Sequence, residues 1–158
     1  MNSLSNKIIF NKISQSEEDT KSLAIEFAKF IDNIYQKKGS IVIYLDGNLG
    51  LGKTTFVRFF LQALGYEGFV KSPTFTIVES YDVSNIRNIK IHHFDLYRLS
   101  DPEELEYIGI DEYFENSISF IEWPCHGEGF IKQPDFLINI SKFQKDSEFV
   151  RNFKIIKI

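Results

Sequence analysis

Cysteine is nearly absent from this sequence, because Cys125 is the only one and no disulfide can form within the chain. A lone thiol is typical of a reducing compartment. No apolar run approaches the roughly 20 residues that a helix needs to cross a bilayer. The segment from Met1 to Ile13 is polar and broken, without the apolar core of a signal peptide. These absences predict a cytoplasmic protein that is not held in a membrane.

Arginine is also scarce, with four residues scattered along the chain, and the formal net charge is -4. Proteins that grip nucleic acid unaided usually carry a clustered basic patch. The sequence therefore argues against strong direct binding of RNA or DNA by this chain alone.

Aromatic residues are abundant by contrast, with 16 Phe and 7 Tyr, and most of them are expected to fill a core. A chain of 158 residues favours one domain, here taken as 1–158. At this length roughly 70% of the surface of the unfolded chain is buried on folding, which is enough for a substantial core.

Apolar periodicity predicts strands and helices that alternate along the chain. Helices are expected after a cap at Ser14 or Ser16 and ending at 37–40, over 54–64 with a stop at Gly65, and from 101–104 onward. Strands are expected over 7–13, 41–45, 89–94 and 118–121, and a loop from 69 leads into a strand that ends at 81 and is followed by a turn over 82–88. The segments 136–140 and 149–158 are expected to form a closing hairpin around the turn 145–147.

The continuous apolar run 41–45 suits a strand that is covered on both faces, as in a parallel sheet. Together these elements predict an α/β fold of the P-loop NTPase type. Its mostly parallel sheet would be flanked by helices and closed by a C-terminal antiparallel hairpin.

A glycine-rich loop follows this strand at once and matches the full pattern G-x-x-x-x-G-K-[ST], as Gly47, Asn48, Leu49, Gly50, Leu51, Gly52, Lys53 and Thr54. Glycines let the backbone turn tightly and aim its N–H groups at phosphate oxygens, and the following helix directs its positive end at the same anion. Lys53 would reach the β- and γ-phosphates, and Thr54 would place its hydroxyl on Mg²⁺. Thr55 is the weaker metal candidate. The strand before the loop and the helix after it favour ATP binding over a glycine turn without a ligand.

A phosphate loop needs a further acid to hold Mg²⁺, commonly at the end of a neighbouring strand. Glu122 ends the apolar run 118–121, and Asp95 ends the strand through Phe94. Alternatively, either residue is a surface acid at the end of a strand, with no role in metal binding.

The segment Lys71 to Thr76 lies where many P-loop proteins carry a nucleotide-sensing loop. Ser72 and Thr74 offer hydroxyls and Pro73 stiffens the backbone. The alternative is a plain loop that leads into the next strand.

Several other side chains could in principle bind a metal, contact the nucleotide or act in catalysis, but the sequence gives weaker support for these roles. His92 and His93 are adjacent in a strand and so face opposite sides, which makes a shared zinc ion improbable. Trp123 follows Glu122 and either flanks the nucleotide or packs as a core indole. Cys125 and His126 are neighbours in sequence, an arrangement that rarely aligns a nucleophile with its base.

Five stretches in this order and spacing resemble the bacterial TsaE (YjeE-type) family: 45–55, 70–76, 93–99, 101–106 and 121–124. The resemblance implies an ATPase that is weak alone and is required for threonylcarbamoylation of the adenosine beside the anticodon in tRNAs that read codons beginning with adenosine. It also implies the partners TsaD and TsaB, whose pair would be reset or activated by the ATP cycle, with tRNA engaged only indirectly.

The family pattern assigns roles to residues of this chain. Lys53 would contact phosphates, Thr54 and Glu122 would bind Mg²⁺, and Asp95 would be a second acid, direct or through water. Ser72, Pro73 and Thr74 would form a switch segment. Asn48 stands where the family usually has Asp, and Leu51 where it usually has Ala. Both lie at variable positions of the loop and remove no needed group.

Two rival functions share the phosphate loop. A kinase of a small molecule or nucleoside would also need a basic lid to clamp the transferred phosphoryl group, and no arginine-rich lid is visible in the sequence. The sequence distinguishes poorly between an ATPase and a regulatory module that binds nucleotide without hydrolysing it.

Overall fold

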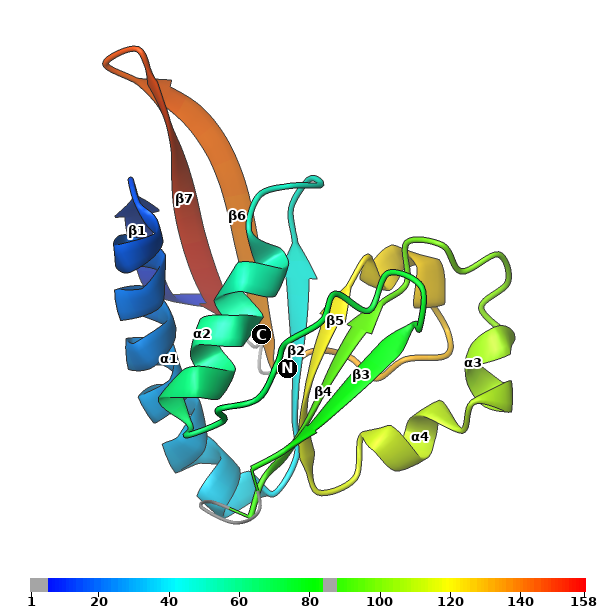
Figure 1. Ribbon diagram of the computed structural model, residues 1–158. Helices are drawn as coiled ribbons and strands as arrows, with labels where there is room; N and C mark the ends of the chain where they lie inside the picture. Colours follow the sequence, from blue (N-terminus) through cyan, green and yellow to red (C-terminus); the bar gives the residue numbers. More distant parts are fainter. Residues whose placement is uncertain (1–5, 84–87) are drawn as a thin grey trace.

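The computed structural model describes residues 6–83 and 88–158, and these contribute the seven strands of one sheet (Figure 1). Its order is β1-β7-β6-β2-β5-β4-β3. The strands are β1 (Lys7–Ser14), β2 (Ile41–Asp46), β3 (Val78–Asp82), β4 (Lys90–Asp95), β5 (Ser117–Glu122), β6 (Phe136–Lys145) and β7 (Glu148–Lys157). The central strands β6, β2, β5 and β4 are parallel, as predicted, whereas both edges of the sheet are antiparallel.

Helices cover the two faces of the sheet unequally (Figure 1). One face carries α1 (Glu17–Lys38) and α2 (Lys53–Ala63), and the other carries the short helices α3 (Glu104–Tyr107) and α4 (Ile110–Tyr113). A 3₁₀ turn, η1 (Pro124–Gly127), follows β5. The start of α1 settles the choice of cap, since the Ser16 hydroxyl accepts from the backbone N–H of Asp19 at 3.2 Å.

The core is divided between these two faces by the alternation of side chains along each strand. Ile41, Ile43 and Leu45 of β2 pack with the larger cluster under α1 and α2, while Val42 belongs to the smaller cluster under α3 and α4. Because β2 is buried on both faces, its continuous apolar run is explained.

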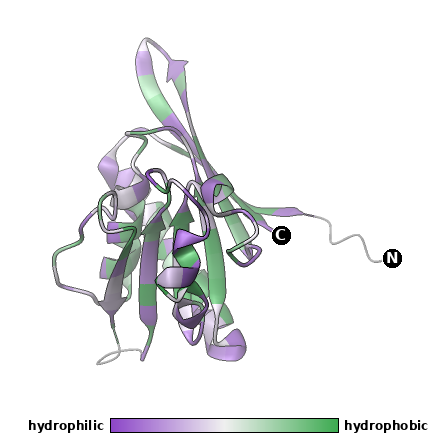
Figure 2. Cartoon of the chain, turned by 90° about the vertical axis from the view of Figure 1, so that its right-hand side faces the viewer, coloured by the Kyte–Doolittle hydropathy of each residue, from purple (hydrophilic) through white to green (hydrophobic). Residues whose placement is uncertain are grey.

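The closing hairpin of β6 and β7 is confirmed and runs further than predicted, projecting beyond the helices in Figures 1 and 2. Asp146 and Ser147 form its turn with φ values of 48° and 67°, the left-handed conformation that two-residue hairpin turns require. Residues 141–145 continue β6 because they pair along β7 as far as Glu148.

The alternation expected over 75–81 is wrong at its start. β3 begins only at Val78, and Ile77 has a φ of 67°, which breaks the extended backbone. Its N–H bonds to the carbonyl of Pro73 at 2.9 Å, so the preceding residues form a turn. Phe75 is consequently 82% exposed. Of the turn predicted over 82–88, residues 84–87 lie outside the described part of the chain.

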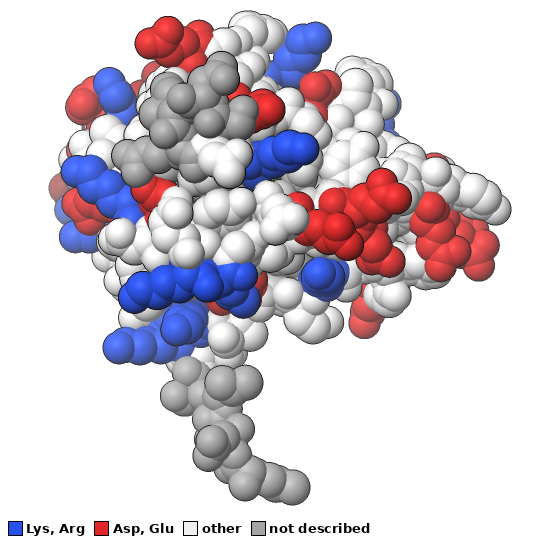
Figure 3. Space-filling view, turned by 90° about the horizontal axis from the view of Figure 1, so that it is seen from below, with Lys and Arg blue, Asp and Glu red and all other residues white. Residues whose placement is uncertain are grey.

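Charge is distributed unevenly over the surface. Seen from below, acidic side chains gather on the side of the molecule where α3 and α4 lie (Figure 3). These helices carry acids in their first turns, namely Glu104 and Glu106 in α3 and Asp111 and Glu112 in α4. Across the two described stretches of chain, every helix is too short or too polar to cross a bilayer.

Candidate functional site

The glycine-rich loop joins β2 to α2 at the carboxyl edge of the parallel strands (Figure 1). Gly50 and Gly52 have φ values of +78° and +94°, a conformation that side chains with a Cβ rarely adopt. A Cβ added to Gly47 would lie 2.8 Å from the carbonyl oxygen of Ile140 on β6. The loop therefore depends on its glycines for both its curvature and its close approach to the neighbouring strand.

Lys53 is the first residue of α2 and is 6% exposed, an unusual degree of burial for a lysine. Its ammonium donates to the carbonyl of Gly47 at 2.5 Å and lies 3.9 Å from Oε2 of Glu122. It also lies 4.9 Å from the centre of the Trp123 ring. The side chain is thus folded over the loop, held by a backbone carbonyl, a carboxylate and an aromatic face. Thr54 and Thr55 follow in the first turn of α2 and are half-buried.

The two predicted acids are neighbours. Glu122 ends β5 and Asp95 ends β4, and the two residues are directly paired in the parallel register of these strands. Glu122 is 4% exposed and Asp95 is 6% exposed. The alternative of surface acids is wrong for both.

Each acid has its own partners. Oε1 of Glu122 lies 2.8 Å from Nε2 of His93. Asp95 accepts from the backbone N–H of Tyr97 at 3.0 Å and from the Thr74 hydroxyl at 3.4 Å. The carboxylates are therefore held by different parts of the protein, one by a buried ring and the other by the segment around Thr74.

The segment 71–76 is connected to the site through that contact. The hydroxyls of Ser72 and Thr74 lie 2.8 Å apart, and Thr74 reaches Asp95. The guanidinium of Arg98, from the loop after β4, lies 4.3 Å from the centre of the Phe75 ring. The structure brings Ser72 and Thr74 to the edge of the sheet where Lys53 and Glu122 lie.

Trp123 combines features of both interpretations. It has a φ of 54° and is half-buried, and its ring lies 4.9 Å from that of Tyr97. It packs against the smaller core while its face is turned to the Lys53 ammonium. The indole is therefore neither wholly core nor wholly free.

Cys125 and His126 lie in η1, where the cysteine is exposed and Nδ1 of His126 donates to the carbonyl of Leu96 at 2.9 Å. His92 and His93 do face opposite sides of β4: Nδ1 of His92 lies 2.7 Å from the Ser80 hydroxyl, and His93 points to Glu122.

The donor set suits a magnesium ion that also binds phosphate. Within residues 6–83 and 88–158, there is no cluster of three or more His, Cys, Asp or Glu residues that would enclose a metal. Mg²⁺ usually binds one or two carboxylates and completes its coordination with waters and substrate phosphates. Asp95 and Glu122 would offer the carboxylates, and Thr54 would offer a hydroxyl. The residues present therefore fit the ion.

Two residues near the site were not assigned a role from the sequence, His93 and Arg151. The Nε atom of Arg151, on β7, lies 3.9 Å from where a Cβ on Gly52 would be, and it is buried without a hydrogen-bond partner among the described residues. Arg151 shares a small cavity with Thr55 and the start of α1. Nothing in the local sequence pattern signals this, because the contact depends on the pairing of distant strands.

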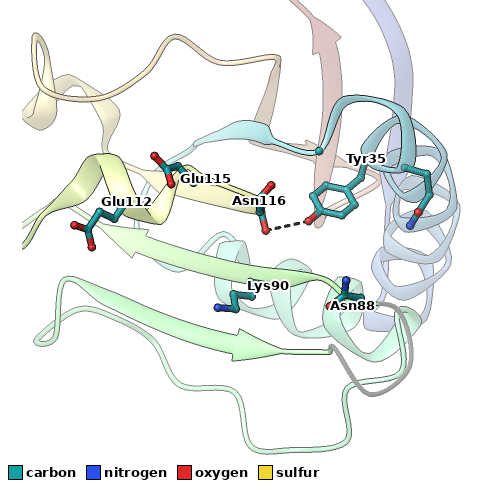
Figure 4. Close-up of a pocket in the computed structure, with 8 residues that line it drawn as sticks. Tyr35, Asn88, Lys90, Glu112, Glu115 and Asn116 are labelled. Atoms are coloured by element: carbon teal, nitrogen blue, oxygen red, sulfur yellow. Dashed lines mark hydrogen bonds between the residues drawn. The ribbon is translucent and has the colours of Figure 1, made fainter.

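A separate cavity of about 620 Å³ lies at the opposite edge of the sheet, between the end of α1, the start of β4 and the segment before β5 (Figure 4). The Tyr35 hydroxyl donates to the carbonyl of Asn116 on its wall at 2.9 Å. The cavity shares no residue with the glycine-rich loop, which has its own cavity of about 470 Å³ beside β6.

Comparison with known proteins places the chain in a family. A family model described as "Threonylcarbamoyl adenosine biosynthesis protein TsaE" matches residues 14–152. The tRNA threonylcarbamoyladenosine biosynthesis protein TsaE of Haemophilus influenzae is 46% identical over 132 residues, 83% of this chain and 78% of that protein. The TsaE protein of Aquifex aeolicus is 38% identical over 144 residues, 90% of this chain and 94% of that protein.

The match to the TsaE protein of Bacillus subtilis is 40% identical and spans 67% of this chain but 61% of that protein. Among solved structures, YdiB of Bacillus subtilis superposes with a TM-score of 0.72 at 27% identity and covers 97% of this chain and 87% of that one. The fold predicted from the sequence is thereby confirmed. The chain belongs to the TsaE family of threonylcarbamoyl adenosine biosynthesis proteins.

Proposed function

We propose that this chain is a magnesium-dependent ATPase that serves the threonylcarbamoyladenosine modification of tRNA by acting on a complex of TsaD and TsaB. The observation that carries the ATPase part is the position of Lys53. Its buried ammonium lies between the carbonyl of Gly47 and the carboxylate of Glu122, at the amino end of α2. A cation held at a helix amino terminus beside a glycine-rich loop is suited to a polyphosphate.

The binding step follows from the loop itself. Gly50 and Gly52 adopt backbone conformations that allow the loop to present N–H groups to an anion, and the dipole of α2 adds to the attraction. Lys53 would exchange its contact with the Gly47 carbonyl for the β- and γ-phosphate oxygens of ATP. Leu49 is 64% exposed, so the loop crest is accessible.

The hydrolytic step needs charge stabilisation and an oriented nucleophile. Thr54, Glu122 and Asp95 would hold Mg²⁺, which neutralises charge on the phosphate oxygens when bound. Lys53 adds a second positive charge from the protein. Thr74 contacts Asp95, so a change at the phosphates that moves Asp95 would also move the segment 71–76, which would act as a switch.

The partners are proposed from the family and from charge. A net charge of -4 and acidic side chains on α3 and α4 do not favour a tRNA backbone. TsaD and TsaB would therefore contact the chain directly, and tRNA would be engaged only through the complex in the cytoplasm. Tight binding of tRNA by the isolated protein at physiological salt would contradict this part.

The decisive experiment measures ATP turnover with and without the TsaD–TsaB pair, using a pair shown to be competent for modification. Slow release of inorganic phosphate by the chain alone and faster release with the pair are expected. No stimulation by a competent pair would contradict the accessory role. A phosphorylated small molecule in place of inorganic phosphate would instead support a kinase.

A further inference from the structure

The buried ring of His93 contacts the candidate metal acid directly. His93 is 0% exposed and lies on β4 two residues before Asp95, so both side chains point to the face of the sheet that α2 covers. Its Nε2 atom lies 2.8 Å from Oε1 of Glu122 on the adjacent strand. The second ring nitrogen, Nδ1, is buried without a hydrogen-bond partner among the residues that the structure describes.

The contact identifies which nitrogen carries the hydrogen. An ionised carboxylate only accepts hydrogen bonds, so Nε2 of His93 must donate to Glu122. Nδ1 is then the ring nitrogen left without a partner among the described residues. Leaving a polar atom buried and unpaired costs free energy, and an apolar side chain here would avoid that cost. The contact with Glu122 is the feature of this position that calls for an imidazole.

The two oxygens of Glu122 have different surroundings. Oε1 faces His93, and Oε2 lies 3.9 Å from the ammonium of Lys53. That second separation is an ion pair longer than a hydrogen bond, and Oε2 has no hydrogen bond among the described residues, so it is the oxygen available to a metal ion. Fixing one oxygen by a rigid buried ring holds the other toward the phosphate loop.

We propose that His93 is a positioning residue, which orients the carboxylate of Glu122 so that its free oxygen faces the phosphate and metal site. This inference rests on the proposed ATPase function. In this arrangement His93 would touch neither nucleotide nor metal and would act through Glu122. Removal of such an outer partner typically lowers metal affinity or activity by about 10–100-fold.

The test compares three variants at the two adjacent histidines. His93→Leu removes the donor and leaves an apolar side chain, His93→Gln keeps an N–H donor near the position of Nε2, and His92→Leu is the matched control on the opposite face. His92 bonds to Ser80 and lies away from Glu122. For each variant, kcat, the KM for ATP, the Mg²⁺ concentration for half-maximal turnover and the affinity for ATP in EDTA are measured, with Tm to monitor folding.

His93→Leu is expected to lower kcat or to raise the Mg²⁺ requirement by about 10–100-fold while ATP affinity in EDTA stays near that of the wild type. His93→Gln should recover part of the loss. His92→Leu should alter Tm but leave kcat and the Mg²⁺ requirement unchanged. Wild-type turnover and Mg²⁺ dependence in His93→Leu would overturn the positioning role alone, whereas a wild-type protein without ATP turnover would overturn it together with the proposed function.

A spectroscopic measurement tests the same contact without nucleotide or metal. Long-range ¹H–¹⁵N spectra of the free wild-type protein are expected to show His93 protonated on Nε2. The Nδ1-protonated tautomer would overturn the proposal, and this outcome does not depend on whether His93→Leu folds.

Discussion

The two faces of the sheet are covered by very different layers. On one face α1 has 22 residues and α2 has 11, and the ring of Phe27 in α1 packs against those of Phe56 and Phe60 in α2. On the other face α3 and α4 have four residues each, and the core beneath them is a small cluster around Phe94 and Phe114. The core under each layer is buried, but the two layers differ in how much apolar surface they cover.

The candidate site belongs to the first face. Lys53 begins the helix that covers it, and His93, Asp95 and Glu122 continue the strand positions that pack below. A site that must hold side chains within fractions of an ångström is best built on rigid elements. The thin layer instead carries the acidic surface of α3 and α4. The difference suggests that geometry is maintained by one face while the other contributes mainly surface.

The largest expected effect is the loss of unfolding free energy when a buried phenylalanine is replaced by alanine, compared between the two cores. Phe60 and Phe114 are both 0% exposed. Phe60 packs against Phe120 and Phe27 with ring centroids 4.9 Å and 5.9 Å apart. Phe60→Ala is expected to lower the free energy of unfolding by about 3–5 kcal/mol, because the dense layer cannot collapse into the cavity. Phe114→Ala should cost at least about 1 kcal/mol less, since a thin layer relaxes more readily.

Urea denaturation of both variants measures this difference, and equal m-values would show that the unfolded states are comparable. An equal or greater loss for Phe114→Ala would show that the thin layer is as rigid as the thick one. The comparison between the two faces would then fail.

The second effect separates chemistry from packing on the first face. Lys53→Met keeps most of the length of the side chain and removes its charge, so ATP turnover is expected to fall by about 10²–10³-fold, the usual cost of losing one charge-stabilising donor. The Tm of Lys53→Met should change much less than that of Phe60→Ala. Arg58→Met in the same helix is the control, because the Arg58 guanidinium lies over Phe59 rather than in the loop. Loss of turnover in both variants would indicate damage to α2 and not to the site.

The third effect concerns pH and the thin face. Burial first, and the charge of Lys90 second, lower the pKa of His92 from 6.5 to about 4. Between these values the unfolded chain binds a proton that the native protein does not, so the free energy of unfolding falls as pH drops from 6.5 toward 4. His92→Gln is expected to weaken this dependence by about 1–3 kcal/mol across the window.

Denaturation of both proteins at several pH values checks the expectation, because their difference cancels the titration of other groups. Parallel stability curves for the wild type and His92→Gln would contradict it. The ring of Tyr113, from α4, lies 5.0 Å from that of His92, so the result also reports on how well α4 excludes water from β4.

The sequence predicted the parts of this architecture that depend on local pattern. The glycine pattern placed the loop between β2 and α2, and the strand-end rule named Asp95 and Glu122 as the two candidate metal acids. Their direct pairing across β4 and β5 was not predicted. The hairpin was expected at 145–147, where Asp146 and Ser147 form the turn. In each case the signal lies within a few neighbouring residues.

Contacts that depend on the pairing of distant strands could not be predicted from local sequence pattern. The N-terminal strand β1 joins β7 at one edge of the sheet, and this register brings Arg151 opposite Ser14 and near Gly52. The contact of His93 with Glu122 likewise depends on which strands become neighbours. The positive φ of Ile77 opposes the preference of a β-branched residue, so propensity pointed to a strand there. The choice between core and site for Trp123 also needed the position of Lys53.

The smallest effect concerns how the covering helices begin. Ser16 caps α1 through its hydroxyl, whereas α2, α3 and α4 have no side-chain cap, so among these helices only α1 is stabilised in this way. Ser16→Ala is expected to cost about 1 kcal/mol, because the N–H of Asp19 loses its partner. Ser22→Ala, at an exposed position inside the same helix, should be neutral or slightly stabilising, since alanine is the better helix former. Hydrogen exchange should show the loss concentrated in the first turn of α1 and leave α3 and α4 unchanged. If Ser16→Ala instead accelerated exchange in α3 and α4 as much as in α1, the two layers would open together, and their separation into a rigid and a relaxed face would not describe this protein.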